Sequence, residues 1–481
     1  MKNILLISVF CFLISAGTTA KAQNADSIAI KRIFTDALTD TTSYHNLRTL
    51  TGSYAGRLAG TAQSMKAVKW AEQLLKGMGL DTVYLQECKV RHWERGTKET
   101  GRVISAKAGN HELVICALGG SVPTVANGLT ANVVEVKDYD ELKKLGKEKV
   151  SGKIVFINHP ADPSLYNTFA AYGGVAGYRV RGAVQAAYYG AIAMIDRSAT
   201  TSLDNFPHTG VMHYADTVNK IPALSVSTLE ADELSKWIKA DPELKIFLKT
   251  SCTELPEAVS YNVIGELRGT EHPDEIIAFG GHLDCWDIGQ GAHDDGAGVV
   301  QSIDILRLCK SLNLKTKHTI RVVVFMDEEM EQRGAKAYAE ASKKMLDAGY
   351  WMLDKQNTSG TAHPLTQPYR HVAAIEADRG GFTPWGFSID GTDNQVKKIQ
   401  SWKNLLLPYG LFFFEKGGSG VDVGKLKEQG VPLLGLVPDS QRYFDYHHSA
   451  NDTFKAVNIR ELQLGTASMA AMVYLIDEYG L

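Results

Sequence analysis

The chain has 481 residues, of which 44% are hydrophobic and 22% are charged, and its formal net charge at pH 7 is −3. A chain of this length is expected to form two or three domains, because a domain typically holds about 100–200 residues. The nearly neutral charge and the lack of a long basic run give no reason to expect nucleic acid or an anionic membrane surface as a partner.

The N-terminus has the pattern of a cleavable secretory signal. Lys2 precedes an apolar run at residues 4–14, and the sequence AKA at residues 20–22 matches the small residues of a cleavage site. The apolar run is shorter than the roughly 20 residues of a membrane-spanning helix, and no later segment reaches that length. We therefore predict that residues 1–22 are a signal peptide and that the protein is secreted or periplasmic, the alternative being an uncleaved anchor.

Cysteines are not expected to build the scaffold of this protein. After the signal segment they are odd in number, widely spaced and without a Cys-x-x-Cys pair: Cys88, Cys116, Cys252, Cys285 and Cys309. Most are expected to be buried as small hydrophobic residues, and one or two disulfides remain open at this point.

Helical segments and then short strands are predicted in the first part of the mature chain. Residues 26–80 are predicted to be helical, with Ala67, Ala71 and Leu75 at helical spacing and glycines at the end. Short strand-like runs follow, namely VYLQECKV, RVISA and ELVICAL.

The middle of the chain alternates short strands and helices. This pattern predicts a compact α/β unit at residues 123–250, inserted into a larger domain made of residues 23–122 and 251–481. One stretch of this unit, GGVAGYRVRGA at residues 173–183, is predicted to be a glycine-rich loop that precedes a helix.

After residue 260 strands and helices alternate regularly. The predicted strands EIIAFGG, TIRVVVFM, HVAAIEA and VPLLGLV are mostly continuous apolar runs, which is typical of strands buried on both faces of a largely parallel sheet. Helices are predicted at VVQSIDILRLCKSL, GAKAYAEASKKML and IRELQLGTASMAAMVYLIDEY. The predicted fold class is therefore α/β, with a mixed, mostly parallel sheet and helices on both of its faces.

Each of these four strands leads to residues that can bind a metal. In chain order the residues are His282, Asp327-Glu328-Glu329, Asp378 and, after a loop, His447-His448. Ligands bind at the carboxyl ends of the strands in open α/β sheets. Each residue alone has an ordinary interpretation, such as a core histidine, a charge at a helix terminus or a loop side chain. Their recurrence at successive strand ends favours a single metal site.

The residue types suit zinc. Imidazole and carboxylate groups, three or four to an ion, are typical ligands of this metal. A carboxylate such as Asp294 can bridge two ions, as in two-metal hydrolytic sites. In the pair Glu328-Glu329, one carboxylate can bind metal while its neighbour takes a proton from water and passes it to a leaving amine.

The chain resembles the cocatalytic dizinc exopeptidases, a family that includes aminopeptidases and glutamate carboxypeptidases, over nearly all of its mature length. The motifs that carry the resemblance are GRLAGTAQSMKAVKWAEQLLKGMGL at residues 56–80, HWERG at 92–96, PHTG at 207–210, GHLDCWDIGQGA at 281–292 and HHSANDT at 447–453. The resemblance implies a zinc exopeptidase fold in which the insert at residues 123–250 is a protease-associated domain.

The resemblance also implies a metal-ligand set. His282 and Asp378 would bind one zinc ion, Glu329 and His448 would bind the other, and Asp294 would bridge the two.

Further residues take catalytic roles by the same resemblance. Glu328 would act as the general base and acid, and Asp284 would lie behind the first histidine ligand and fix its tautomer. His448 is preferred to His447 because the family pattern places an acid four residues after the ligand, where this chain has Asp452.

Two positions depart from the family pattern, and one backbone feature follows from it. The loop GGSGVDVG lacks a serine before Asp422, and Cys285 stands where relatives have serine, so its thiol is expected to pack and not to bind zinc. The resemblance implies a cis peptide between Asp294 and Asp295.

The function implied by the resemblance is that of an exopeptidase with two Zn²⁺ per chain, and the N-terminal signal pattern adds secretion or periplasmic export. It would hydrolyse dipeptides or short peptides with a metal-activated water, and a homodimer is implied as well. The alternatives are an aminopeptidase that acts on longer peptides and a receptor-like binding protein with an inactive site on the same fold. The second alternative is disfavoured because the five ligands and Glu328 are all present.

An arginine of the insert is the candidate for substrate recognition. A guanidinium binds a carboxylate through two parallel hydrogen bonds, and an enzyme that recognises a free C-terminus needs such a group. The resemblance favours Arg179 over Arg181, and the alternative is that both arginines are merely solvated.

Overall fold

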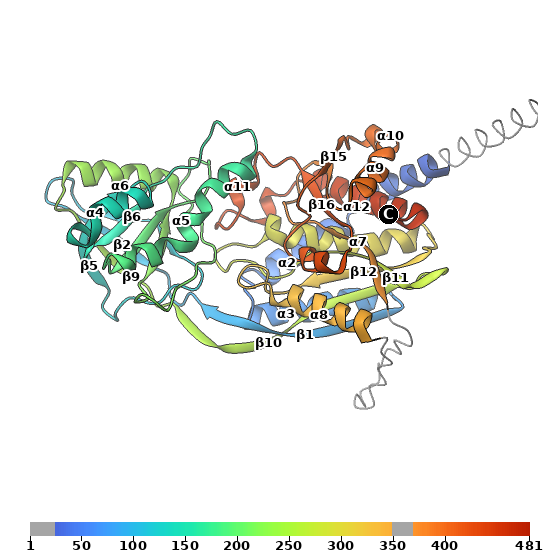
Figure 1. Ribbon diagram of the computed structural model, residues 1–481, viewed down its shortest axis with the longest axis horizontal. Coiled ribbons are helices and arrows are strands. Elements are labelled where there is room, and N and C mark those ends of the chain that lie inside the picture. The colour runs from blue at the N-terminus through green and yellow to red at the C-terminus, as the bar shows by residue number, and fades with distance from the viewer. Residues whose placement is uncertain (1–24, 349–368) are drawn as a thin grey trace, which may run out of the picture.

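The computed structural model describes residues 25–348 and 369–481, which form two eight-stranded sheets with helices packed against them (Figure 1). The predicted signal peptide, residues 1–22, lies outside the described residues. Within the described part of the chain, no helix is both long enough and apolar enough to cross a membrane.

The predicted N-terminal helical segment forms three separate helices. The first covers residues 25–39, α2 spans Thr42–Ser53 and α3 spans Ala62–Gly77. The break before α3 contains Gly56 and Gly60, whose φ angles of 65° and 85° lie in the left-handed region that favours glycine.

The first sheet joins strands from both ends of the described chain. In spatial order its strands are β1 Thr82–Glu94, β10 Thr253–Leu267, β12 His318–Phe325, β11 His272–His282, β13 Arg370–Glu376, β16 Leu433–Pro438, β14 Pro384–Asp390 and β15 Phe413–Lys416. β12, β11, β13 and β16 are parallel neighbours, whereas β1 and β10 pair antiparallel at one edge. The sheet is therefore mixed with a parallel centre, as predicted.

Helices cover both faces of this sheet. They are η1 Ala292–Gly296, which is a π-helical turn, α7 Ala297–Ser311, α8 Arg333–Ala348, α9 Asp393–Ser401, α10 Lys403–Leu406, α11 Tyr443–Tyr446, α12 Ile459–Tyr479, and the 3₁₀ turns η2 Leu407–Tyr409, η3 Val423–Gln429 and η4 Phe454–Ala456. Ile277 and Phe279 of β11 belong to the hydrophobic core that includes α7 and α12, whereas Ile276 and Ala278 belong to the core that includes α8. Because both faces are buried, the central strands are mostly apolar.

The second sheet lies beside the first. In spatial order its strands are β3 His111–Leu113, β2 Thr100–Ile104, β9 Lys245–Lys249, β5 Leu129–Val136, β6 Ile154–Ile157, β7 Ala193–Arg197, β8 Ala223–Val226 and β4 Ile115–Ala117, and its helices are α4 Tyr139–Val150, α5 Thr168–Tyr188 and α6 Thr228–Ala240. β2 pairs with β9 and β4 pairs with β8. This sheet therefore begins near residue 100, before the boundary at residue 123 that the sequence suggested.

The stretch predicted as a glycine-rich loop, residues 173–183, is helical and lies inside α5. The side chain of Asn167 caps the start of this helix by accepting a hydrogen bond from the backbone of Ala170. Open space surrounds Gly173 and Gly174, so no close contact requires glycine there. The loop prediction was wrong because capping and tertiary packing outweigh a helix cost of about 1 kcal/mol per glycine.

The two sheets meet where α5 lies against α11 (Figure 1). Phe169 of α5 stacks on Tyr443 with ring centroids 5.6 Å apart, and Tyr172 stacks on Phe444 at 4.6 Å. This aromatic contact directly precedes the His447-His448 pair in the chain, so the second sheet borders the predicted site.

Candidate active site

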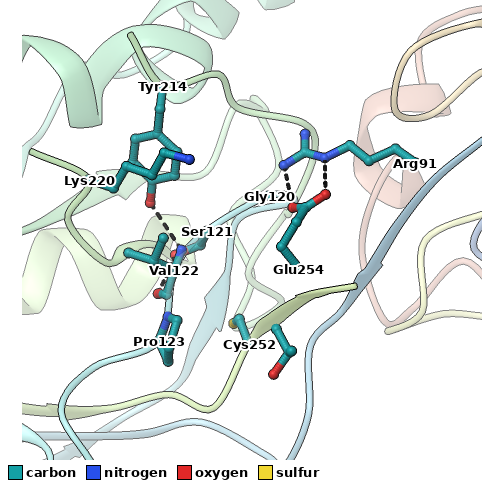
Figure 2. A pocket seen from close by; sticks show the side chains of 10 residues that line it. Arg91, Gly120, Ser121, Val122, Pro123, Tyr214, Lys220, Cys252 and Glu254 are labelled. Carbon is teal, nitrogen blue, oxygen red and sulfur yellow. Dashed lines mark hydrogen bonds and ion pairs between the residues drawn. The ribbon is translucent and has the colours of Figure 1, made fainter. Parts of the chain in front are cut away.

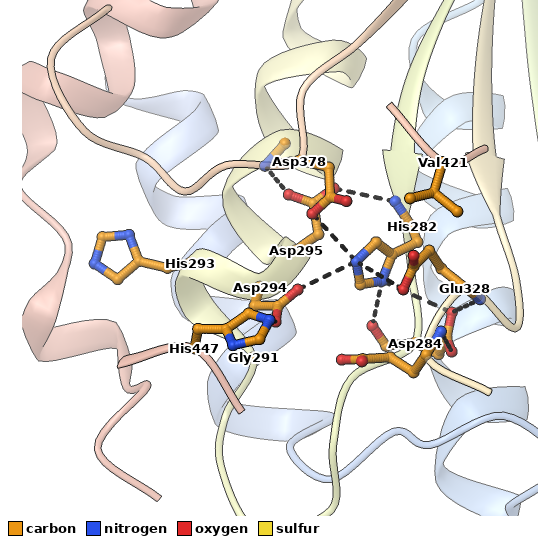
Figure 3. A network of polar contacts seen from close by, with 12 residues as sticks. His282, Asp284, Gly291, His293, Asp294, Asp295, Glu328, Asp378, Val421 and His447 are labelled. Carbon is orange, nitrogen blue, oxygen red and sulfur yellow. Dashed lines mark hydrogen bonds and ion pairs between the residues drawn. The ribbon is translucent and has the colours of Figure 1, made fainter. Parts of the chain in front are cut away.

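The predicted site residues converge at one edge of the first sheet. β12, β11, β13 and β16 are parallel neighbours, so their carboxyl ends lie at the same edge. β11 ends at His282 itself, and the other three strands are followed by the glutamate pair, by Asp378 and by the two histidines. The side chains meet in a buried polar network (Figure 3).

One group of side chains surrounds the ring of His282. Its Nε2 lies 3.2 Å from Asp294 Oδ1, 3.4 Å from Asp378 Oδ1 and 4.0 Å from Glu328 Oε2. The ligand atoms of His282, Asp294 and Asp378 lie close enough together to hold one metal ion. Figure 3 shows the acids directed toward the imidazole from separate elements.

A second group surrounds His448, on the other side of Asp294. His448 Nε2 lies 3.0 Å from Glu329 Oε2 and 3.4 Å from Asp294 Oδ2. Asp294 therefore directs one carboxylate oxygen to each group. His447 Nε2 also lies 3.7 Å from Asp294 Oδ2, and its ring stacks on that of His448 at 3.6 Å, but it forms no ion pair with Glu329 among the described residues.

The chemistry of these donors fits bound cations. Among the fourteen buried side-chain atoms without a hydrogen-bond partner within the described residues, four lie together in these two groups: His282 Nε2, Asp294 Oδ2, Glu329 Oε1 and Asp378 Oδ1. Buried polar atoms without partners are costly and rare. All four belong to residues predicted as metal ligands, and a metal ion in each group would satisfy them.

The electrostatics of the site also call for positive charge. Burial raises the pKa of Glu328 well above its usual range, and the neighbouring acids Asp378 and Asp294 raise it further. Burial by itself would lower the pKa of His282, but Asp378 and Asp294 outweigh it and hold that pKa well above the usual value. Several acids packed this closely repel one another unless cations lie between them.

The Asp284 carboxylate was expected to contact the His282 ring, but it binds the backbone of residues 327–329. His282 Nδ1 donates to the backbone carbonyl of Asp284 at 3.0 Å, whereas the Asp284 carboxylate is 3.9 Å away. That carboxylate accepts hydrogen bonds from the backbone N–H groups of Asp327 at 2.8 Å and of Glu328 and Glu329 at 3.3 Å each. The carbonyl therefore orients the imidazole with Nε2 toward Asp294 and Asp378, and the Asp284 carboxylate holds the loop of the two glutamates.

Two further acids hold the loop that carries Asp294. Asp452 accepts hydrogen bonds from the backbone N–H of His293 at 2.8 Å and of Asp294 at 3.1 Å. Asp295 accepts from the backbone N–H of His282 at 3.0 Å. The peptide between Asp294 and Asp295 is cis, as the resemblance implied.

Arg57 was not predicted from the sequence as part of the site. It is fully buried and donates to the carbonyl of Gln290 at 2.7 Å, to that of Gly291 at 2.9 Å and to that of Leu283. It thus joins both ends of the loop between β11 and η1. Its place in the GRLAG motif was the signal that could have identified it.

The described cysteines form no disulfide, and Cys285 is buried as a packing residue.

A cavity of about 500 Å³ lies at the junction of the sheets, where Arg91 forms an ion pair with Glu254 at 2.7 Å (Figure 2). None of the predicted site residues lines this cavity.

Comparison with known proteins identifies the family. The family model described as Peptidase family M28 matches residues 262–473. Carboxypeptidase Q from Bos taurus is 32% identical over 436 residues, which cover 91% of this chain and 85% of that protein. The chain belongs to peptidase family M28. This confirms the predicted exopeptidase family, and this M28 peptidase is a metallo-exopeptidase.

Solved structures share the fold of this peptidase. The peptidase M28 precursor from Shewanella amazonensis SB2B is 32% identical, with a TM-score of 0.85 over 95% of this chain and 97% of that chain. BSAP, a zinc aminopeptidase from Bacillus subtilis, is 21% identical, with a TM-score of 0.60 over 90% of this chain and 93% of that chain.

A loop of the second sheet holds His448 in this M28 peptidase. Thr209 donates its backbone N–H to the carbonyl of His448 at 2.9 Å and accepts from His448 Nδ1 at 3.3 Å. His208 Nδ1 donates to the carbonyl of His447 at 2.6 Å. The PHTG motif therefore orients the His448 ring, a role that its sequence alone did not reveal.

Arg179 lies against the same loop. Its side chain is buried, with 5% exposure, and its Nη1 donates to the carbonyl of Thr209 at 3.4 Å. Its guanidinium carbon lies 5.5 Å from the centroid of the Tyr172 ring. Arg179 is thus not a solvated side chain, whereas Arg181 is exposed.

Proposed function

We propose that this peptidase is a secreted exopeptidase that hydrolyses dipeptides or short peptides with two zinc ions per chain. The observation that carries the proposal is the position of Asp294, whose two carboxylate oxygens are directed to separate groups of ligands. His282 and Asp378 would hold one ion and Glu329 and His448 the other. Bound there, the pair of ions would polarise the scissile carbonyl and make a water molecule more acidic.

Glu328 is the general base and acid in this proposal. Its side chain is 16% exposed, whereas that of Glu329 is 2% exposed, so Glu328 is the more accessible to substrate and water. Its carboxylate accepts no hydrogen bond from the described residues, while Asp284 holds its backbone N–H at 3.3 Å. A carboxylate fixed through its backbone and free at its oxygens can take a proton from water and return it to the leaving amine.

Arg179 supports recognition of a free C-terminus. It lies beside His448 because both contact the carbonyl of Thr209. A cation at one end of the site can bind the terminal carboxylate of a short peptide. The alternative function is an aminopeptidase that acts on longer peptides, and the fold shared with a zinc aminopeptidase supports it.

Three further parts of the proposal rest on sequence. Secretion or periplasmic export rests on the signal pattern of residues 1–22. The assignment of the insert as a protease-associated domain and the formation of a homodimer rest on the family resemblance.

A dipeptide panel tests the proposed function. Each dipeptide would be assayed with free ends, with an acetylated N-terminus and with an amidated C-terminus, with and without a chelator. We expect hydrolysis of the free dipeptides, loss of activity with chelator and recovery with zinc, and metal analysis should give two ions per chain. Retained activity in the chelated, metal-free protein would refute the zinc mechanism, and faster cleavage of longer or amidated peptides would favour the aminopeptidase.

A further inference from the structure

Arg379 directly follows the predicted ligand Asp378 and is held between two elements. Its Nη2 donates to the carbonyl of Gly418 at 2.9 Å, and its guanidinium carbon lies 5.5 Å from the centroid of the Phe169 ring. Phe169 comes from α5, beside the second sheet, and also stacks on Tyr443 at 5.6 Å. The guanidinium is therefore partly buried at the seam between the two sheets, next to the site.

Arg379 forms no close ion pair in the described part of the chain, although Asp378 and Glu376 attract its charge at longer range. A guanidinium has five N–H donors, and this one makes a single hydrogen bond and no ion pair with any residue in 25–348 or 369–481. The nearby Glu376 is occupied, because its two oxygens accept the backbone N–H groups of Val421 at 2.8 Å and Val423 at 2.6 Å. Asp378 itself is directed to His282.

Three other arginines near the site have more partners than Arg379, whereas the buried Arg179 likewise forms no ion pair with a described residue. Arg57 donates to three carbonyls, and Arg95 forms an ion pair with Asp287 at 2.6 Å. Arg442 packs over Phe382 as Arg379 packs over Phe169, but its Nη2 forms an ion pair with Glu461 at 2.7 Å. A partly buried guanidinium whose donors lack acceptors is costly. A ligand that brings a negative charge would supply the missing partner.

We propose that Arg379 binds a carboxylate of the peptide substrate on the Asp378 side of the site and makes this enzyme prefer a substrate that carries this carboxylate over its neutral counterpart. The inference rests on the proposed peptidase function. Phe169 and Gly418 hold the guanidinium while its remaining donors stay free, and a fixed fork of donors matches the two oxygens of a carboxylate. Arg179 lies near His448, so the two arginines would contact different parts of a substrate.

Three matched substrate pairs distinguish the sources of the carboxylate. Glu-Ala against Gln-Ala tests the first side chain, Ala-Glu against Ala-Gln tests the second, and Ala-Ala against its C-terminal amide tests the terminus. For each pair, the ratio of kcat/KM for the acid to kcat/KM for its neutral partner would be measured. The variants are Arg379→Gln and Arg379→Lys, with Arg442→Gln as the matched control because it removes the same charge from a paired arginine.

We expect one of the three ratios to fall about ten- to a hundredfold in Arg379→Gln, as for a lost hydrogen bond to a charged group. Arg379→Lys should retain part of that preference because lysine keeps the positive charge but cannot donate two parallel hydrogen bonds. Arg442→Gln should leave all three ratios within about twofold. The pair that responds identifies the carboxylate. Zinc content and melting temperature of each variant show that the site and fold are intact.

Equal losses on all six substrates, or unchanged ratios, would overturn the inference and make Arg379 a packing residue or a general counter-charge to the acids. Such a result leaves the proposed peptidase function intact if the wild-type protein cleaves the panel. If the zinc-loaded wild-type protein cleaves none of the six substrates, the proposed function itself fails and this inference fails with it.

Discussion

Glu328 and Glu329 are adjacent in the chain but occupy different surroundings. The Glu329 carboxylate is enclosed and lies 3.0 Å from His448, whereas Glu328 is more exposed and lies 4.0 Å from His282. The backbone N–H groups of both residues donate to the carboxylate of Asp284, and these hydrogen bonds fix the backbone from which each glutamate side chain extends. The difference in surroundings is the physical basis for assigning one glutamate to proton transfer and the other to metal binding.

Substitution of each glutamate by glutamine tests this division. Glu328→Gln should keep both metal ions and lower kcat by about 10²–10⁴-fold, because an amide cannot accept the proton of water. Glu329→Gln should weaken binding of the ion near His448, because it removes a charged ligand. Metal analysis and kcat/KM on a free dipeptide measure the two effects. Loss of zinc in Glu328→Gln with full zinc in Glu329→Gln would mean that the roles are reversed.

At the scale of elements, the loop between β11 and η1, together with η1 itself, is held by side chains from outside it. Arg57 binds carbonyls at both ends of this loop, and Asp452 binds the backbone N–H groups of His293 and Asp294. Neither residue belongs to the loop. An irregular segment with few backbone hydrogen bonds of its own depends on such side chains to keep its position.

Arg57→Met should destabilise the protein, because three buried carbonyls lose their donor. An unsatisfied buried group costs about 1–3 kcal/mol, so we expect the free energy of unfolding to fall by about 3–5 kcal/mol. Urea denaturation of the metal-free protein measures this effect without the contribution of bound zinc. Arg460→Met, at an exposed position of α12, is the control and should change stability by less than about 0.5 kcal/mol. Equal stabilities of the two variants would show that Arg57 does not hold the loop.

At the scale of the whole molecule, the site is assembled from both sheets. The first sheet supplies the predicted metal ligands, and the second sheet supplies the PHTG loop that contacts His448 and the helix α5 that carries Arg179. The aromatic contact between α5 and α11 joins the two parts beside the site. Substrate recognition is therefore expected to depend on the insert even though the predicted metal ligands follow strands of the first sheet.

Arg179→Ala tests this dependence with one substrate in two forms. The variant should lose about 2–3 kcal/mol of transition-state binding on a dipeptide with a free C-terminus and little on its amide. Arg181→Ala, on an exposed residue of the same helix, should affect neither form. Comparison of kcat/KM for the two forms gives the result. Equal losses on both forms, or no loss, would place recognition of the carboxylate elsewhere and favour the aminopeptidase.

The sequence by itself determined the four parallel strands at the centre of the first sheet and the edge where the predicted ligands gather, but it did not indicate β10, β14 or β15. Continuous apolar runs such as EIIAFGG indicated strands buried on both faces, and parallel strands bring their carboxyl ends to one edge. Residues far apart in the chain, such as His282 and Asp378, could therefore be assigned to one site before any contact was known.

Only the tertiary structure decided which atoms meet. The sequence could not show that the Asp284 carboxylate binds backbone N–H groups of residues 327–329, because that contact spans more than forty residues. Nor could it show that β2 pairs with β9, and because of this pairing the second sheet begins near residue 100 and not at residue 123. It also could not show that residues 173–183 are helical. Local patterns report propensity and burial, whereas pairing partners, helix packing and side-chain directions depend on contacts that form only when distant segments come together.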